Sequence, residues 1–275
     1  MNRMLNGLCY LKNLKGLEKW NVSNVKNMSG MFYGELLLEN IDEVKNWTTS
    51  NLMKINYMFK GCSSLKNLKG LNNWDISKIN NLDSTFTECS SLESLEGISQ
   101  WNTSNIKSMY ETFYGCGSLF DLNALSNWDK SNLQEIDYTF DVCLSLKSLK
   151  GISQWNVSNI INMDMTFYSC QSLLNFDDIE NWNIKNVKTL SGTFCNWDKI
   201  INLNFLKNWK VDNIEYMDTL FEGCYSLKDI KGLKNWNTKN LISISGMFEN
   251  CGSLISLEGL ENLDLNKVEN MRNLF

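Results

Sequence analysis

The chain has 275 residues, of which 43% are hydrophobic and 21% are charged, and its formal net charge is −5. This composition supports a continuous apolar core and excludes an intrinsically disordered chain. Acidic and basic residues are interleaved without a lysine-rich block or stripe, so the sequence predicts no nucleic-acid partner. We also predict no transmembrane segment, because the sequence contains no run of 18 apolar residues. The N-terminus lacks an apolar segment with a small-residue cleavage site, which predicts that this chain has no signal peptide.

Tryptophan and phenylalanine recur at a fixed interval of 27 residues. The tryptophans are Trp20, Trp47, Trp74, Trp101, Trp128, Trp155, Trp182, Trp209 and Trp236, and the phenylalanines are Phe32, Phe59, Phe86, Phe113, Phe140, Phe167, Phe194, Phe221, Phe248 and Phe275. A fixed period of this length is the signature of a solenoid, in which each unit buries its apolar face against its neighbours. We therefore predict one solenoid domain, 1–275, with ten repeats at 6–32, 33–59, 60–86, 87–113, 114–140, 141–167, 168–194, 195–221, 222–248 and 249–275.

The first half of each unit is predicted to hold a short parallel strand. In the unit 60–86, Leu65, Leu68 and Leu71 are spaced by three residues, a spacing typical of the strand in leucine-rich repeats. We place the strand near residues 66–69 and at its 27-residue translates. Gly70 and its counterparts follow, and there we expect the chain to turn out of the strand.

A tryptophan and, four residues later, an asparagine come next in the unit. We expect all nine spaced tryptophans to be buried, because each ring adds roughly 150–250 Å² to the buried apolar surface. The asparagines are predicted to form a buried ladder whose side-chain amides bond backbone groups. They are Asn24, Asn51, Asn105, Asn132, Asn159, Asn186, Asn213 and Asn240.

The second half of the unit is predicted to hold a helical or 3-10 turn. Ile79, Leu82 and Phe86 are separated by three and four residues, which favours such a turn centred on the phenylalanine and running to the cysteine. The fold class that follows is an α/β repeat solenoid with one short parallel strand and one short helical or 3-10 turn in each unit.

Seven cysteines lie three residues after the phenylalanine. Stacked units would bring them near enough for disulfides, but each cysteine would then have two equivalent neighbours, and the chain contains no histidine to complete a zinc site. We favour a ladder of buried, reduced thiols and predict no metal and no cofactor. The seven are Cys62, Cys89, Cys116, Cys143, Cys170, Cys224 and Cys251.

Charge alternates in sign between units on the predicted strand face. Lys66 and Lys69, for example, are followed one unit later by Glu93 and Glu96. Opposite charges on lateral neighbours of a parallel sheet attract each other, although each exposed pair contributes only tenths of a kcal/mol. The pattern therefore indicates control of register and solubility.

Apolar residues interrupt this charge pattern and mark a candidate partner-binding surface. Leu174, Ile201 and Phe205 stand in adjacent units, with Phe205 in place of the turn glycine. They are expected to form an apolar patch with aspartates at its rim, and such patches often mark interaction sites. The alternative is that drift of the repeat has left a few apolar side chains on the surface. The candidate residues are Phe120, Leu174, Asp177, Asp178, Ile201, Phe205 and Ile255.

The repeat consensus reads W-[ND]-x-S-N-[VI]-x-x-M-x-x-M-F-x-x-C-x-S-L, and it is nearly complete at 20–32 and again at 155–173. It resembles the tryptophan-containing repeats of BspA-type leucine-rich-repeat surface proteins, which are common in mycoplasma surface lipoproteins. The resemblance covers all ten units and implies a right-handed solenoid, a cell-surface location and a role in adhesion or recognition, without catalytic residues. The departures from the consensus are Glu35, Lys78, Trp197, Leu263 and Lys267.

Three classes of function are compatible with this sequence. We favour a recognition or adhesion module that binds a protein or a glycan. The second class is a structural spacer or self-assembling array, because Phe275 completes a unit without a polar cap and uncapped terminal repeats would associate end to end. The third is an enzyme, which without histidine would need paired carboxylates or a Cys–Lys arrangement. No unit carries an insertion that would hold such a site.

Overall fold

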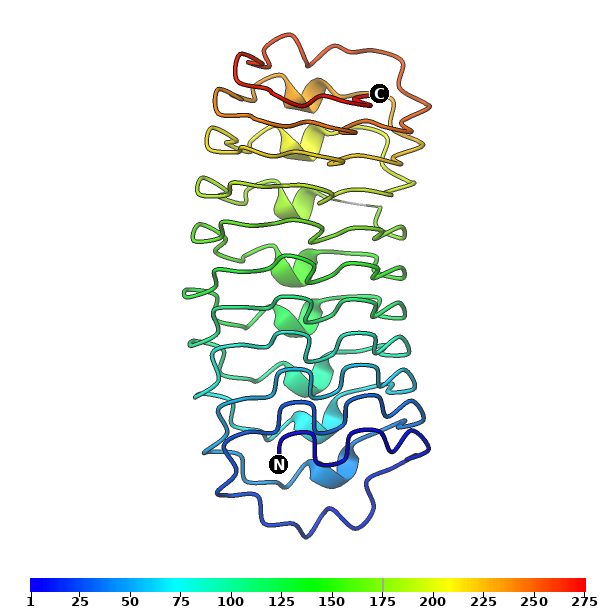
Figure 1. The fold of residues 1–275 in the computed structure, drawn as a ribbon, viewed down its shortest axis with the longest axis vertical. Helices are drawn as coiled ribbons and strands as arrows, with labels where there is room; N and C mark the ends of the chain where they lie inside the picture. The colour runs from blue at the N-terminus through cyan, green and yellow to red at the C-terminus, as the bar shows by residue number, and fades with distance from the viewer. Residues whose placement is uncertain (175) are drawn as a thin grey trace.

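Successive 27-residue units form coils that stack along one axis and place the two termini at opposite ends of the column (Figure 1). The computed structural model describes residues 1–174 and 176–275. Neighbouring coils are joined by backbone hydrogen bonds at each level, such as Phe59 N–H to the Thr85 carbonyl at 2.9 Å. The chain is therefore a leucine-rich-repeat-like solenoid, as the period of 27 predicts.

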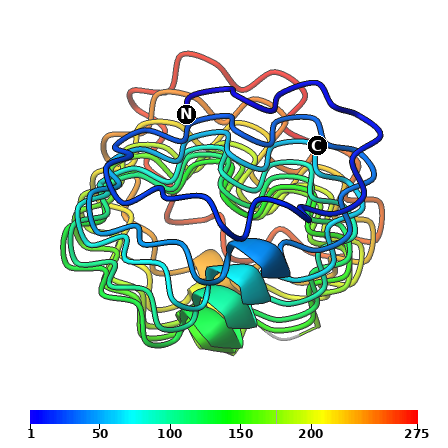
Figure 2. The same ribbon diagram turned by 90° about the horizontal axis from the view of Figure 1, so that it is seen from below.

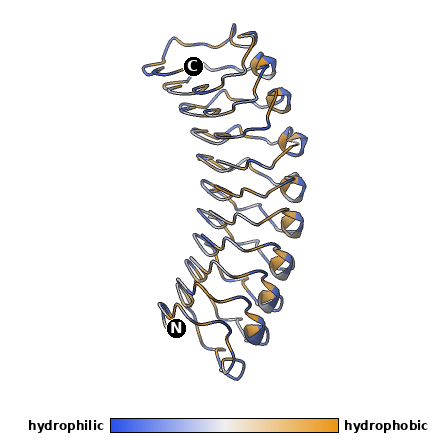
Figure 3. Cartoon of the chain, turned by 90° about the vertical axis from the view of Figure 1, so that its right-hand side faces the viewer, coloured by the Kyte–Doolittle hydropathy of each residue, from blue (hydrophilic) through white to orange (hydrophobic). Residues whose placement is uncertain are grey.

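Short 3-10 helices form a column on one side of the solenoid, opposite a zigzag of the chain (Figure 2). The column curves gently, with these helices on its outer side (Figure 3). Each helix is closed by a backbone bond of the kind that Lys45 N–H donates to the Asp42 carbonyl, 3.3 Å long. The helices of the described residues are η1 (Asp42–Val44), η2 (Lys69–Leu71), η3 (Glu96–Ile98), η4 (Asn123–Leu125), η5 (Lys150–Ile152), η6 (Asp177–Ile179), η7 (Asn204–Leu206) and η8 (Lys231–Leu233).

The position predicted for the strand is largely taken by these helices. η2 begins at Lys69, so the extended stretch before it is too short for a strand. At this level of the coils, parallel pairing in the described residues is limited to the isolated bridges Asn67–Ser94 and Asn202–Asp229. The prediction of a strand at 66–69 is therefore wrong in detail, because the chain bends into a 3-10 helix after two residues.

Glycine within the helix allows consecutive helices to pack closely. A Cβ atom on Gly70 would lie 1.9 Å from the Ile41 carbonyl oxygen, and one on Gly151 would lie 1.8 Å from that of Leu122. Neither glycine has a positive φ, so the role of these two is close approach. Their counterparts Gly16 and Gly259 have positive φ and lie in turns, as predicted. Where a residue with a Cβ stands at this position, as Ala124 does in η4, the helix packs less closely on the preceding one.

The segment around the conserved phenylalanine is a zigzag of tight turns and not the helical turn that the spacing predicts. Each zigzag contains two left-handed residues, for example Tyr57 (φ 61°) and Gly61 (φ 76°), and such residues interrupt a right-handed helix. Alternate N–H groups donate to the next coil, while those between them close the turns, as Cys62 N–H does to the Phe59 carbonyl at 3.0 Å. A series of isolated parallel bridges, including Asn81–Ser108, runs beside the zigzag.

Aromatic ladders fill the core between the zigzag and the helices. The rings of Phe59 and Phe86 stack with centroids 5.7 Å apart, and the Phe side chains at this position are buried from Phe32 to Phe248. The spaced tryptophans from Trp47 to Trp236 are buried as predicted. Trp20 differs because it is only half-buried.

Polar atoms in the core bond to carbonyl groups of the preceding coil. The Sγ atom of Cys89 donates to the Phe59 carbonyl at 3.2 Å, and all seven in-phase cysteines are free and buried, as predicted. Trp197, which stands at the cysteine position, donates its Nε1–H to the equivalent carbonyl of Phe167 at 2.6 Å. A threonine ladder that sequence reasoning missed repeats this bond, with Thr112 Oγ1 donating to the Leu82 carbonyl at 3.1 Å.

The asparagine ladder bonds the backbone, but it is not buried as predicted. The Asn105 Nδ2 group donates to the Ser77 carbonyl at 2.6 Å, and this bond to the preceding coil recurs at the other asparagines from Asn51 to Asn240. These side chains lie at the outer edge of the coils and are exposed or half-buried. Their amide groups reach the carbonyl of the preceding coil from this edge, so the hydrogen-bonding role does not require burial here.

Candidate functional site

Opposite charges of consecutive units meet where the sequence pattern predicts. Lys66 Nζ lies 3.5 Å from Glu39 Oε2, and Lys231 Nζ lies 2.9 Å from Glu258 Oε2. Both pairs are about half exposed, so solvent screening leaves each pair with little effect on the stability of the fold. These ion pairs favour the observed register of the coils. The units that carry an apolar residue in place of a charged one are therefore the unusual ones on this side of the molecule.

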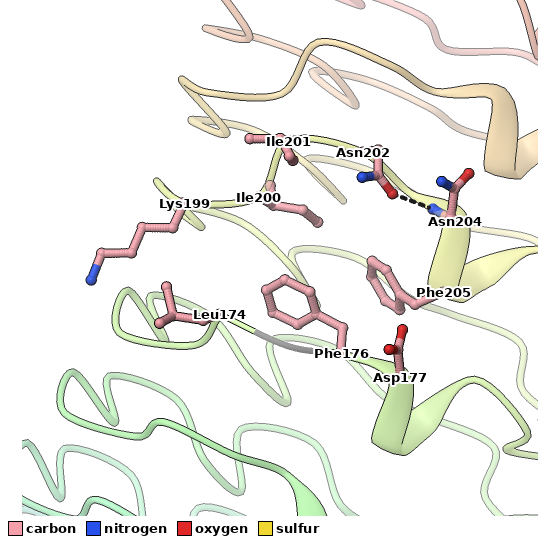
Figure 4. Close-up of a pocket in the computed structure, with 9 residues that line it drawn as sticks. All are labelled: Leu174, Phe176, Asp177, Lys199, Ile200, Ile201, Asn202, Asn204 and Phe205. Carbon is pink, nitrogen blue, oxygen red and sulfur yellow. Dashed lines mark hydrogen bonds between the residues drawn. The ribbon is translucent and has the colours of Figure 1, made fainter.

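Four of the seven candidate residues surround one hollow of about 380 Å³ between the coils 168–194 and 195–221 (Figure 4). Leu174 and Ile201 form its rim and are 70% and 56% exposed. Asp177 and Phe205 also line it. Of the predicted apolar patch and its acidic rim, the structure places Leu174, Ile201 and Asp177 around this hollow.

The three other candidate residues lie outside this hollow. Phe120 and Ile255 are exposed on different units. Asp178 is half-buried in η6, and its Oδ2 accepts a hydrogen bond from Ser148 Oγ at 3.4 Å. The structure therefore does not unite all seven residues into one surface.

Phe205 was predicted to lie on the surface, and this is wrong because its side chain is only 4% exposed. Its ring packs against Phe176 and Phe194, with centroids 5.1 and 5.6 Å away. Trp197 completes the cluster by stacking on Phe176 at 4.4 Å. Where Phe176, Trp197 and Phe205 stand, most other units carry leucine, cysteine and glycine, and η7 is accordingly held away from η6. The extra aromatic volume therefore opens the hollow.

The floor of the hollow is apolar and its edges carry polar groups. Ile200 and Phe176 are buried beneath the exposed Leu174 and Ile201. Lys199 lies at one edge, and Asp177 lies at another, as the first residue of η6 (Figure 4). Chemically, this arrangement is suited to holding an apolar side chain between groups of opposite charge.

A second unusual group lies on the zigzag side and was missed by sequence reasoning. Tyr114, Asp141 and Tyr168 are 27 residues apart and occupy the same position in three consecutive coils. The Asp141 side chain is 4% exposed, and its Oδ1 atom has no hydrogen-bond partner among the described residues. Burial, followed by the nearby Glu111 carboxylate, raises the pKa of Asp141 to about 7. The signal in the sequence is weak because this position is variable from unit to unit.

The raised pKa of Asp141 predicts that the protein loses stability as the pH increases. Between the ordinary pKa of an aspartate, about 3.9, and the native value, the native state holds a proton that the unfolded state has released. Folding stability therefore falls as the pH rises from about 4 to about 7. We expect Asp141→Asn to unfold at a higher urea concentration than the wild type at pH 8, with little difference at pH 4. The unfolding midpoints at the two pH values are the measurement.

Asp129→Asn is the matched control for this pH dependence. Hydrogen bonds from Ser131 lower the pKa of Asp129, so this residue is ionised in both the folded and the unfolded state above pH 5. Asp129→Asn should therefore leave the dependence of folding stability on pH unchanged. Burial raises the pKa of Asp137 to about 6, so Asp141→Asn should keep part of the dependence of folding stability on pH. If Asp141→Asn kept all of this dependence, Asp141 would not be its cause.

The described residues hold neither a metal cluster nor a membrane helix. In residues 1–174 and 176–275, no three His, Cys, Asp or Glu side chains are grouped so that they could hold a metal ion. No helix in the same part of the chain is long and apolar enough to cross a membrane.

Comparison with known proteins matches the whole length of the chain to a single family. A family model described as a Mycoplasma protein of unknown function, DUF285, matches residues 1–118, 90–199 and 172–275. This match agrees with the resemblance to tryptophan-containing mycoplasma repeats that the consensus indicates. No curated protein matches the chain.

Two solved structures are similar to the chain at low identity. The leucine-rich repeat protein TpLRR of T. pallidum shares 18% identity with a TM-score of 0.34, over 85% of this chain and 73% of that one. A leucine-rich cell surface protein of Faecalibacterium prausnitzii shares 16% identity with a TM-score of 0.33, over 86% of this chain and 78% of that one.

Proposed function

The chain belongs to the mycoplasma family of unknown function DUF285, and on this premise we propose that it is a non-catalytic recognition module of the cell surface. The observation that carries the proposal is the hollow between η6 and η7, where two exposed aliphatic side chains stand above a buried apolar floor. Contiguous exposed apolar patches often mark interaction sites. We propose that the partner docks there.

The backbone beside the hollow favours an extended peptide as the partner. In several other pairs of coils, an N–H at this level donates to the preceding coil, as Lys66 N–H does to the Glu39 carbonyl at 3.2 Å. Among the described residues, the equivalent bond from Ile201 N–H to the Leu174 carbonyl is not made, and it is also not made from Phe120 N–H or from Leu174 N–H. A peptide strand could pair with these backbone groups while it places an apolar side chain in the hollow, which is recognition by strand addition.

Side chains at the hollow's edges would fix the direction of such a peptide. Lys199 and Asp177 line opposite parts of it, and opposite charges at the two edges favour one orientation of a charged segment. Their contribution is mainly to specificity, because both side chains are exposed and salt screens exposed charges.

The test is a selection of random peptides displayed on phage against the full chain. We expect the enriched peptides to share an apolar side chain flanked by charged residues. Ile201→Asp should weaken their binding at least tenfold, about 1.4 kcal/mol, because it places a charge over the apolar floor. Binding would be measured by titration with a synthetic copy of an enriched peptide.

Ile255→Asp is the matched control. Ile255 occupies the same position in its unit and is 81% exposed, but it does not line the hollow. Equal loss of binding in both variants would show that the hollow is not the site, and failure to enrich any peptide would also overturn the proposal.

End-to-end self-association through the terminal repeats stays a prediction. Apolar side chains such as Leu257 and Phe275 are exposed in the last unit. Sedimentation velocity on the full chain over a range of concentrations would detect such association.

A further inference from the structure

A second hollow, of about 450 Å³, lies on the zigzag side near the first units. Its lining follows from the repeat, because residues 27 apart are lateral neighbours in consecutive coils. Arg3, Gly30 and Tyr57 form one row, and Asn6, Tyr33 and Lys60 form the second row, three residues further along each coil. Gly30, in the middle of the first row, is buried against the Arg3 side chain.

The backbone alone does not explain why glycine stands at position 30. Gly30 has a φ of 60°, a conformation that favours glycine. The same position nevertheless carries Tyr57, Ser84 and Glu111 with φ between 51° and 61°, so this fold tolerates side chains there. A Cβ on Gly30 would lie 3.1 Å from Arg3 Cγ and 3.7 Å from Arg3 Nε, so a larger side chain would have to displace the Arg3 side chain that lines the hollow. The effect of this glycine is therefore to leave room for Arg3 at the edge of the hollow.

The groups that line the hollow combine flat apolar walls with a cation. Tyr33 and Tyr57 are exposed, so their rings are available to pack against the apolar face of a ligand ring. Lys60 Nζ is already 3.8 Å from Glu111 Oε2. Arg3 has no ion pair within residues 1–174 and 176–275. One uncommitted positive charge therefore favours a ligand with a single negative charge over a phosphate dianion.

We propose that this hollow binds an acidic sugar, a hexose ring that bears one carboxylate. The guanidinium of Arg3 provides a planar pair of donors that matches a carboxylate. The Asn6 amide offers both donors and an acceptor for sugar hydroxyls, and the tyrosine rings cover the C–H face of the ring. The volume falls within the range of small-ligand sites, about 300–1,000 Å³. This site is separate from the hollow between η6 and η7, so either proposal can fail without the other.

The experiment titrates the full chain with methyl glucuronide, with methyl glucoside and acetate as reference ligands, by NMR or calorimetry. We expect the glucuronide to bind at least tenfold more tightly than either reference. Arg3→Gln should reduce that affinity to the level of the neutral glucoside. Gly30→Tyr should abolish binding because the new side chain displaces Arg3 from the edge of the hollow.

Gly246→Tyr is the matched control, because Gly246 stands at the same position eight units later with a φ of 64°. This variant should bind the glucuronide like the wild type, and thermal unfolding of both tyrosine variants would confirm that they fold. Equal binding of glucuronide and glucoside would show that the carboxylate is not recognised. Acetate binding as tightly as the glucuronide would indicate a simple anion site. Either result, an unaffected Arg3→Gln, or no binding of glucuronide, overturns the proposal.

Discussion

Gly151→Ala is expected to separate η5 from η4 and to lower the free energy of unfolding by about 1–3 kcal/mol, the usual cost of overpacking. The added Cβ would lie 1.8 Å from the Leu122 carbonyl oxygen and 2.2 Å from its carbonyl carbon, and backbone atoms cannot move aside as the end of a flexible side chain can. Ala124 shows that the fold absorbs such a Cβ by packing consecutive helices less closely. We therefore expect local separation and not complete unfolding, measured by urea denaturation.

Gly117→Ala is the control for this substitution. A Cβ there would meet only Leu144 Cδ1, at 4.0 Å, and the φ of Gly117 is not positive. The free energy of unfolding of Gly117→Ala should match that of the wild type to within about 0.5 kcal/mol. Equal midpoints for the two variants would mean that the glycines in the helices do not set how closely these helices approach each other.

The core of this fold was predictable because a period of 27 residues decides which side chains are neighbours. Any residue that recurs at one position, such as Phe86 or Cys89, must stack on its own copies in adjacent coils. Spacing alone could not distinguish helix, strand and turn within a coil. Apolar residues three apart occur in the zigzag because it turns every few residues, and the left-handed positions carry residues as different as Tyr57 and Glu111, which leave no compositional signal.

Only the solvent-exposed residues of the candidate site could be predicted from the sequence. Leu174 and Ile201 interrupt a charge pattern, and that pattern already marks their position as solvent-facing. The burial of Phe205 follows instead from its packing against Phe176 and Trp197. Each of these residues is a departure in a different part of its unit, so only the structure shows that they share one space.

Trp128→Ala is expected to uncouple the solenoid near its middle. The ring of Trp128 is buried and stacks on Trp101 with centroids 6.2 Å apart, and its Nε1–H donates to the Ile98 carbonyl at 2.9 Å. Truncating a buried aromatic ring costs about 3–5 kcal/mol. Because each coil contacts only its neighbours, that cost falls on the two interfaces around the unit 114–140.

Hydrogen exchange at moderate denaturant is the measurement. Protection should be lost around residues 113–145 in Trp128→Ala, while the coils on both sides remain protected. Trp20→Ala provides the comparison, because Trp20 is half-buried in the first unit and its loss should only fray that end. If Trp128→Ala instead melts all units in one uniform transition at lower denaturant, stacking between nearest neighbours would not govern stability. The chain would then unfold as a single cooperative body, and a weakened interface in its middle would be felt equally at both ends.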